Sequence, residues 1–352
     1  MYVIFLLLTL STMKEYTIRE KLAQMLMFSF SETYITSAST IVKIIKEQKI
    51  GGVILFNANI VSPSQLLTLN TNLQNFSNAY NEMPLFISVD EEGGYVARLS
   101  PKNGFPDTYS AYSIAMKHNY TFTTECGSNI GKTLAGVKIN MNFAPDTDLL
   151  VNPNNPIIAK YNRSFSADPV EDTAQARAFI TGLHNHKILT STKHFPGHGS
   201  STSDSHEGFV DVTDTWQSYE LDPFRNLVDD TDMVMVAHIF NKNLDDTYPA
   251  SLSKKTITGI LRDQLHFNGL VITDSLTMGA ITQNYKYEDA IILALNAGND
   301  ILLICTDNST YPKNTLDILE NAVNTGKIST SRVEQSFQRI MAVKATKLLM
   351  HE

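Results

Sequence analysis

The sequence alternates short apolar runs with longer amphipathic segments, and this alternation limits the folds open to it. Eight apolar runs have the length of buried strands, at residues 25–30, 52–56, 85–89, 139–144, 189–192, 233–238, 270–273 and 300–305. Helical patterns separate or follow them at residues 37–48, 64–80, 123–135, 173–186, 218–227, 254–265, 287–296, 313–324 and 331–349. Strands that alternate with helices predict a parallel sheet of the α/β class. Eight such units within 352 residues predict a single (β/α)8 TIM-like barrel.

Other features narrow the classes of protein further. A doubly wound sheet is the structural alternative, but no Gly-x-Gly-x-x-Gly follows the first apolar run. The formal net charge of −8, without a basic stripe, argues against a nucleic-acid surface. The two cysteines, Cys126 and Cys305, imply no disulfide framework.

The first twelve residues form a hydrophobic leader or a possible signal segment, and residues 13–352 form the expected barrel domain. The run Val3–Leu10 resembles the apolar core of a signal peptide, but no positive residue precedes it and no small-residue cleavage site follows. It is also too short to span a bilayer. We therefore expect a cytoplasmic protein with no stable membrane span. Export to the periplasm is the alternative if residues 1–12 act as a signal.

Polar or ionisable residues stand at or just after the end of five consecutive predicted strands. In a barrel these strand ends converge on one face, where the catalytic groups of such enzymes lie. A single carboxylate there could be only a helix cap, but a repeated pattern predicts an active site at Asp90, Asp146, Asp148, Lys193, His194, His238 and Asp274.

The stretch from Lys193 to His206 is the centre of this site. Its Gly-, Ser- and Thr-rich composition predicts a mobile loop after Pro196. Asp204 and His206 near its far end could bring an imidazole, oriented by a carboxylate, over Lys193 and His194. A zinc site is the alternative use of the histidines and Asp204, but the charge of Lys193 disfavours it.

Two further segments contribute candidate residues. The three successive carboxylates Asp90, Glu91 and Glu92 suggest metal ligands or hydroxyl acceptors. Asp90 continues the third strand and is the expected site residue, whereas the alternative expectation for Glu91 and Glu92 is that they are solvated turn residues. Arg98 lies a short step further on, and Arg163 lies in the long irregular segment 152–168, where its guanidinium could bind a carboxylate or ring hydroxyls.

Six segments together resemble family 3 glycoside hydrolases, in particular the bacterial β-N-acetylglucosaminidases, over residues 18–348. They are VDEEGGYVARL (Val89–Leu99), NFAPDTD (Asn142–Asp148), NRSFSADP (Asn162–Pro169), KHFPGHG with DSH (Lys193–His206), MVAHI (Met235–Ile239) and GLVITDSLTM (Gly269–Met278). The KHFPGHG and DSH pair is the most specific. Departures such as Ser200, Ser201 and Ser275 remove none of the candidate catalytic groups.

The resemblance implies a single-barrel retaining enzyme that removes terminal β-linked N-acetylglucosamine from cell-wall muropeptides or chito-oligosaccharides. It implies that Asp274 is the nucleophile and that His206, oriented by Asp204, is the general acid and then the base. It also implies a substrate-binding set of Asp90, Arg98, Arg163, Lys193, His194 and Met278.

The chemistry is compatible with these residue types. Retaining glycosidases usually pair two carboxyl groups, and here a histidine would replace one of them. Its usual pKa of about 6.5 suits donation to a leaving oxygen and then acceptance from water. We expect a monomer with no second domain, no metal and no cofactor. The alternatives are a β-glucosidase or β-xylosidase of the same family, or a catalytically inactive sugar-binding barrel.

Overall fold

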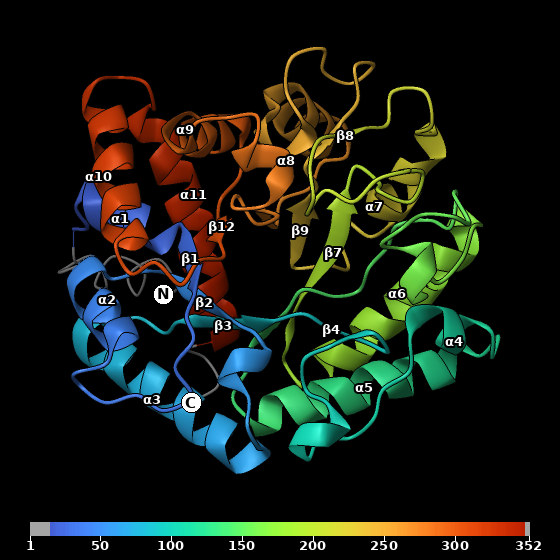
Figure 1. Ribbon diagram of the computed structural model, residues 1–352, viewed down its shortest axis with the longest axis horizontal. Helices are drawn as coiled ribbons and strands as arrows, with labels where there is room; N and C mark the ends of the chain where they lie inside the picture. Colours follow the sequence, from blue (N-terminus) through green and yellow to red (C-terminus); the bar gives the residue numbers. More distant parts are fainter. Residues whose placement is uncertain (1–14, 349–352) are drawn as a thin grey trace, which may run out of the picture.

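A computed structural model describes residues 15–348, which form a barrel of parallel strands surrounded by helices (Figure 1). Within these residues eight strands pair in one sheet, in the order β11-β9-β7-β6-β3-β2-β1-β12. All seven pairs between neighbours in this order are parallel. The strands are β1 (Leu26–Ser29), β2 (Gly52–Leu55), β3 (Phe86–Val89), β6 (Met141–Asn142), β7 (Leu189–Phe195), β9 (Met233–Val236), β11 (Leu270–Thr273) and β12 (Leu302–Ile304).

The sheet closes between its first and last strands in this order, β11 and β12. A parallel bridge joins Ile272 to Ile301, the residue before β12. Ile301 N–H donates to Val271 O at 3.0 Å, and Leu303 N–H donates to Thr273 Oγ1 at 3.1 Å. These bonds leave no open edge, so the predicted eight-stranded (β/α)8 barrel is confirmed.

Helices cover the outside of the barrel and begin at residues suited to capping. Ser62 and Asp168 accept hydrogen bonds from the first turns of α3 (Pro63–Asn81) and α6 (Pro169–His184), each of which starts with proline. The other helices are α1 (Ile18–Gln24), α2 (Thr40–Gln48), α4 (Ala111–Ala115), α5 (Tyr120–Gly136), α7 (Asp222–Asn226), the π-helix Lys255–Gln264, α8 (Gly279–Thr282), α9 (Tyr287–Ala297), α10 (Tyr311–Asn324), α11 (Thr330–Val343) and the π-helical turn Lys344–Leu348.

The closest helix packing, between α5 and α6, depends on two glycines. A Cβ on Gly127 would lie 2.3 Å from Phe179 O, and one on Gly182 would lie 2.2 Å from Thr124 O. Any side chain at either position would therefore force the two backbones apart. This pair of helices supports the strands β6 and β7, which carry much of the candidate site.

Helices α1 and α11, from the two ends of the described chain, lie side by side. Figure 1 shows α1 beside α11, and Lys21 Nζ lies 2.6 Å from Glu334 Oε2 between them. Lys344, which is fully buried, donates to Gln24 Oε1 at 2.7 Å and to Gly51 O at 2.9 Å. Burial lowers the pKa of Lys344 to about 7.

Most predicted boundaries agree with the structure within a few residues, but one strand is longer than predicted. Lys193 and His194 were expected to follow the fifth strand, whereas β7 continues through Phe195. A register shift against β9 falls between Thr192 and Phe195. The alternation of an ideal strand would point Lys193 and His194 to opposite faces, but beside this bulge both line one cavity.

The predicted leader, residues 1–12, lies outside the described residues, so the cytoplasmic location stays a prediction. No helix between residues 15 and 348 has both the length and the apolar character needed to cross a bilayer.

A buried carboxylate ties three elements together at the end of the barrel opposite the candidate site. Asp300, fully buried before β12, pairs with Arg262 at 2.6 Å, Arg339 at 3.1 Å and Arg332 at 3.4 Å. It also accepts the Val271 N–H at 3.0 Å. The π-helix Lys255–Gln264, β11 and α11 are therefore joined by one side chain.

We predict that Asp300→Asn lowers the free energy of unfolding by about 3–5 kcal/mol, because three arginines would lose their buried counter-charge. Urea unfolding followed by circular dichroism measures the change. Asp246→Asn, which removes an exposed carboxylate from its pair with Lys255, is the matched control and should leave the midpoint unchanged. Equal midpoints for the two variants would contradict the prediction.

Candidate active site

The candidate site is a cavity of about 480 Å³ at the carboxyl ends of the barrel strands. The catalytic and substrate-binding residues proposed from the family resemblance line it: Asp90, Arg98, Arg163, Lys193, His194, Asp204, His206, Asp274 and Met278. Asp146, Asp148 and His238, which the strand-end pattern also predicted, are buried and do not line it. The tertiary structure therefore brings together residues from five separate stretches of the chain.

A buried ion network forms the floor of the cavity. Lys193 Nζ lies 2.7 Å from both Asp90 Oδ1 and Glu92 Oε1. Arg163 makes a two-pronged contact with Glu92, with Nε and Nη2 each donating at 2.8 Å. Arg98 Nη2 lies further away, 3.8 Å from Asp90 Oδ2. The floor therefore presents cations whose counter-charges are already in place.

The expectation that Glu91 and Glu92 are solvated turn residues is wrong. Glu91 is 2% and Glu92 6% exposed, because both belong to a small hairpin of β4 (Glu91–Gly93) and β5 (Val96–Ala97) folded over the barrel mouth. Burial alone would favour the neutral acid, but Arg163 and Lys193 hold the pKa of Glu92 far below its usual value. Glu92 is thus the central anion of the floor. Nothing in the local sequence distinguishes it from the adjacent Glu91.

Glu91 has a different role, since it holds the backbone next to Arg98. Its Oε2 accepts the N–H groups of Arg98 at 2.7 Å and Leu99 at 2.9 Å. No cation balances it as Arg163 and Lys193 balance Glu92. Burial therefore raises the pKa of Glu91 to about 7.

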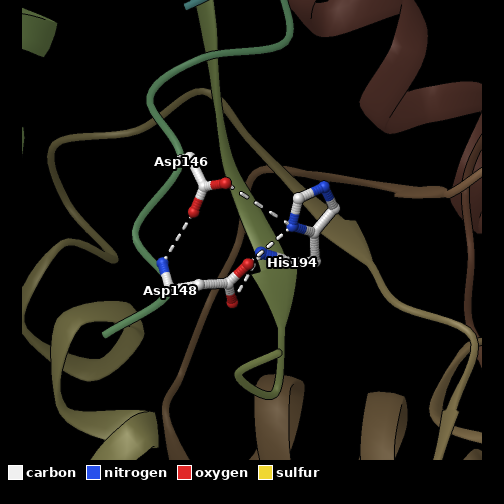
Figure 2. A group of neighbouring side chains, drawn as sticks. All are labelled: Asp146, Asp148 and His194. Atoms are coloured by element: carbon white, nitrogen blue, oxygen red, sulfur yellow. Dashed lines mark hydrogen bonds and ion pairs between the residues drawn. The ribbon is translucent and has the colours of Figure 1, made fainter. Parts of the chain in front are cut away.

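His194 is oriented by carboxylates that follow β6. Figure 2 shows Asp146 and Asp148 on one segment facing His194 on β7. His194 Nδ1 donates to Asp148 Oδ2 at 2.6 Å, and Asp148 Oδ1 accepts the His198 N–H at 2.7 Å. Because Nδ1 carries the shared proton, Nε2 is the atom left to face Arg163 Nη2, at 3.4 Å.

The same three side chains have atoms close enough to hold a cation, but their chemistry does not fit one. Asp146 Oδ2 lies 3.2 Å from Arg163 Nη2, so a guanidinium already supplies the positive charge. Burial and the neighbouring Asp148 raise the pKa of Asp146 well above its usual value, and a protonated carboxyl is a poor ligand. We interpret the cluster as a device that orients His194.

The described residues do not bring His194, His198, Asp204 and His206 together as a zinc site. His198 is fully enclosed and bonds to Ser201 Oγ at 2.6 Å and Ser205 Oγ at 3.2 Å. Asp204 and His206 bond to each other instead. His198 therefore serves to hold the loop itself.

Asp274 lies at the end of β11 among imidazoles. Although burial opposes its ionisation, His238, His194 and His206 together hold the pKa of Asp274 below its usual value. His238 Nε2 donates to Ser275 O at 2.8 Å, and Ser275 N–H donates to Asp274 Oδ1 at 2.7 Å. The cavity therefore contains an ionised carboxylate held at a fixed position.

Asp204 and His206 form a pair at the cavity mouth. Asp204 Oδ1 accepts from His206 Nδ1 at 2.7 Å and from His206 N–H at 2.8 Å. The imidazole is 63% exposed, so Nε2 is free of protein partners among the described residues. A carboxylate that takes Nδ1–H leaves Nε2 as the atom for proton transfer.

The loop that carries this pair is fixed at both ends. Its first part, residues 199–201, is buried rather than exposed, and Asn155 Nδ2 donates to His198 O at 2.8 Å. Its far end accepts hydrogen bonds from the start of α8, where Gly279 N–H donates to His206 O at 3.1 Å. A Cβ on Gly279 would lie 2.7 Å from that carbonyl oxygen, so the approach requires glycine.

Two tyrosines at the cavity wall had no signal in the sequence. The rings of Tyr95 and Tyr161 stack with centroids 3.8 Å apart and planes 10° apart, and both line the cavity. Tyr95 comes from the turn between β4 and β5, and Tyr161 from the long irregular segment. Only folding brings these segments together, so sequence order gave no reason to pair them.

The site combines three chemical capacities. It holds an ionised carboxylate, an exposed imidazole oriented by a second carboxylate, and a charged floor that can bind hydroxyl groups. Met235, Met278 and Leu303 add an apolar wall. This set suits a polyhydroxylated substrate with a small apolar substituent, and it suits two-step chemistry at a carbon between Asp274 and His206.

Comparisons with known proteins agree with this geometry. Residues 17–343 match the profile described as the glycosyl hydrolase family 3 N terminal domain. The chain is 36% identical over 274 residues to a beta-hexosaminidase of Tolumonas auensis, covering 76% of this chain and 79% of that protein. It is 34% identical over 334 residues to beta-hexosaminidase A of Pseudoalteromonas piscicida, covering 87% of this chain.

A solved structure is also similar over nearly the whole chain. The family 3 β-N-acetylglucosaminidase of a Paenibacillus species superimposes with a TM-score of 0.90 at 32% identity, over 96% of this chain. The match spans 64% of the Paenibacillus chain and 55% of the Pseudoalteromonas protein.

The buried Glu91 predicts a pH dependence of stability. Its folded pKa of about 7 exceeds the usual 4.5, so the folded state binds more protons than the unfolded state between these values. The wild-type free energy of unfolding should therefore fall as pH rises through this window, relative to Glu91→Gln, which cannot titrate. We expect the variant to gain roughly 2–3 kcal/mol on the wild type from pH 4.5 to pH 7.5.

Urea unfolding of both proteins at a series of pH values measures this difference. Below pH 4.5 Glu91 is protonated in both the folded and the unfolded state. The difference in the free energy of unfolding between the two proteins should therefore stay constant there, and these points serve as the control. A difference between the two proteins that stays constant across the window would contradict the prediction.

Proposed function

Because the chain belongs to glycoside hydrolase family 3, we propose that it is a β-N-acetylhexosaminidase acting on a carbohydrate substrate. More finely, we propose a retaining exo-β-N-acetylglucosaminidase that removes terminal β-linked N-acetylglucosamine from cell-wall muropeptides or chito-oligosaccharides. The similarity to two beta-hexosaminidases and to the Paenibacillus β-N-acetylglucosaminidase supports the substrate class.

One observation carries the proposal: Asp274 and the Asp204–His206 pair line the same cavity. A protein that only binds sugar has no need of an ionised carboxylate opposite an oriented imidazole. This arrangement therefore argues against the inactive sugar-binding barrel.

The first step forms a bond between a carboxylate oxygen of Asp274 and the anomeric carbon. The bond from that carbon to the leaving oxygen breaks, and its electron pair stays on the oxygen. His206 Nε2–H gives its proton to that oxygen, while Asp204 stabilises the imidazolium before transfer and keeps Nδ1 protonated afterwards. The product of this step is a glycosyl-aspartate.

The second step reverses these roles. Neutral His206 Nε2 takes a proton from water, and the resulting oxygen attacks the anomeric carbon and releases Asp274 as a carboxylate. Two inversions retain the β configuration. An imidazole in place of a second carboxylate also avoids adding negative charge near Asp274.

The floor residues would bind the sugar in this reaction. Lys193 and Asp90 offer a donor and an acceptor already bonded to each other, so they can move onto ring hydroxyls without losing charge balance. Arg98, the least tightly paired cation of the floor, can likewise bind a ring hydroxyl. Arg163 and His194 have their side-chain nitrogens engaged by protein, so they mainly hold the floor in place and bound the sugar site.

The β-glucosidase or β-xylosidase alternative differs in the group at C2 of the sugar. The apolar wall of Met235, Met278 and Leu303 offers a contact for the methyl of an acetamido group, and a hydroxyl would leave it unused. This wall favours the N-acetylglucosaminide over the glucoside.

We predict that the protein hydrolyses 4-nitrophenyl β-N-acetylglucosaminide with a kcat/KM at least about tenfold that for the glucoside. A slow N-acetylglucosaminyl substrate followed by peptide mapping should place the sugar on Asp274, and Asp274→Asn should remove the label. Faster release from the glucoside would favour the alternative, and label on another residue would refute the nucleophile assignment.

We predict that His206→Ala slows substrates with poor leaving groups by roughly 10²–10⁴-fold, because general-acid help matters most when the leaving oxygen is basic. Nitrophenol is a good leaving group, so the rate at which its glycosidic bond breaks should fall much less. A series of aryl glycosides of rising leaving-group pKa measures the slope. Parallel losses across the series would show that His206 is not the acid.

A further inference from the structure

A second cavity of about 490 Å³ adjoins the active-site cavity and shares Tyr161 and Asp204 with it. Its other walls come from Lys160 and from both sides of His206, namely residues 202–203 and 207–209. His206 itself lines the first cavity. The Asp204–His206 pair thus stands at the boundary between the two spaces.

This position has a direct consequence for the reaction proposed above, on which the inference rests. An acid at His206 must reach the oxygen that joins the bound sugar to its leaving group. The sugar lies in the first cavity with Asp274, so the leaving group must continue past His206. The second cavity is the space that lies there.

The lining of the second cavity matches a sugar ring. Tyr161 and Phe209 offer aromatic surface, and Phe209 is 48% exposed. Thr202 and Ser203, both exposed, offer hydroxyls that can donate and accept. Stacking against Tyr95 holds the Tyr161 ring in place, so a ligand need not order it.

The charges in the second cavity discriminate between two classes of aglycone. Its charged groups are Lys160, Asp204 and Glu207. Lys160 Nζ lies 5.1 Å from the centroid of the Tyr161 ring. An acidic aglycone would meet two carboxylates and one ammonium, whereas a neutral sugar would meet no unfavourable charge.

We propose that the second cavity is the aglycone-binding site and that it takes a neutral saccharide, as in a chito-oligosaccharide, in preference to a carboxylate-bearing one. Phe209 and the hydroxyls of Thr202 and Ser203 determine this specificity, and Glu207 repels acidic aglycones. The second cavity binds the leaving group, whereas the first cavity binds the terminal sugar.

The test compares kcat/KM for N,N′-diacetylchitobiose with that for N-acetylglucosaminyl azide, whose leaving group is too small to enter the second cavity. We expect Phe209→Ala to lower the chitobiose-to-azide ratio roughly fivefold, and Ser203→Trp, which fills the cavity from an exposed position, to lower it at least about tenfold. Tyr34→Ala and Tyr34→Trp, which change an exposed tyrosine outside both cavities, are the matched controls and should leave the ratio within about twofold.

A second arm replaces chitobiose by the disaccharide of N-acetylglucosamine and N-acetylmuramic acid, whose aglycone carries a carboxylate. The wild type should prefer chitobiose, and Glu207→Gln should narrow that preference roughly threefold. A wild type that prefers the acidic disaccharide, or ratios that neither Phe209→Ala nor Ser203→Trp changes, would overturn the inference alone. A wild type that cleaves none of these substrates would refute the proposed function and the inference with it.

Discussion

The carboxylate of Glu92 bonds at once to Lys193 and to Arg163, and the remainder of the site is arranged around this buried contact. Desolvating three charges is costly, and only close, complete pairing offsets that cost. Here Glu92 receives hydrogen bonds from Arg163 and lies 2.7 Å from Lys193 Nζ. The contact joins the hairpin after β3, the irregular segment before α6 and the end of β7. Three distant parts of the chain are thereby held at one spacing.

Around this floor the structure divides into a rigid part and an accessible part. Asp274 is half-buried and His194 is buried, and each is oriented by hydrogen bonds, from Ser275 and to Asp148. The imidazole of His206 is instead 63% exposed on a loop. A nucleophile benefits from a fixed position, whereas an acid that must meet leaving groups of different shape benefits from access. The loop reconciles both needs, because its backbone is held at both ends, including at His206 O, while the His206 imidazole stays exposed.

The pKa values of neighbouring buried carboxyl groups shift in opposite directions in this site. Glu92 and Asp148 have cationic or imidazole partners and a lowered pKa, whereas Glu91 and Asp146 have a raised one. All four are buried, so the difference follows from the balance of their neighbours: Asp146 has Arg163 beside it, but burial and the adjacent anion Asp148 outweigh that contact. The site can therefore hold many acidic side chains close together without the full repulsion that their number suggests.

The sequence alone determined the barrel, because strands buried on both faces must be continuously apolar and the helices between them must be amphipathic, and both patterns are local. It also identified the strand-end residues Asp90, Lys193 and Asp274 and the pair Asp204–His206, because chain order places strand ends on one face. It misjudged Glu92 and overlooked Tyr161. The partners of Glu92 lie 71 and 101 positions away, at Arg163 and Lys193, and Tyr161 meets Tyr95 only across two folded loops. Tertiary structure alone decided these contacts, because burial and pairing depend on which segments meet in space, and no local pattern of residues records that.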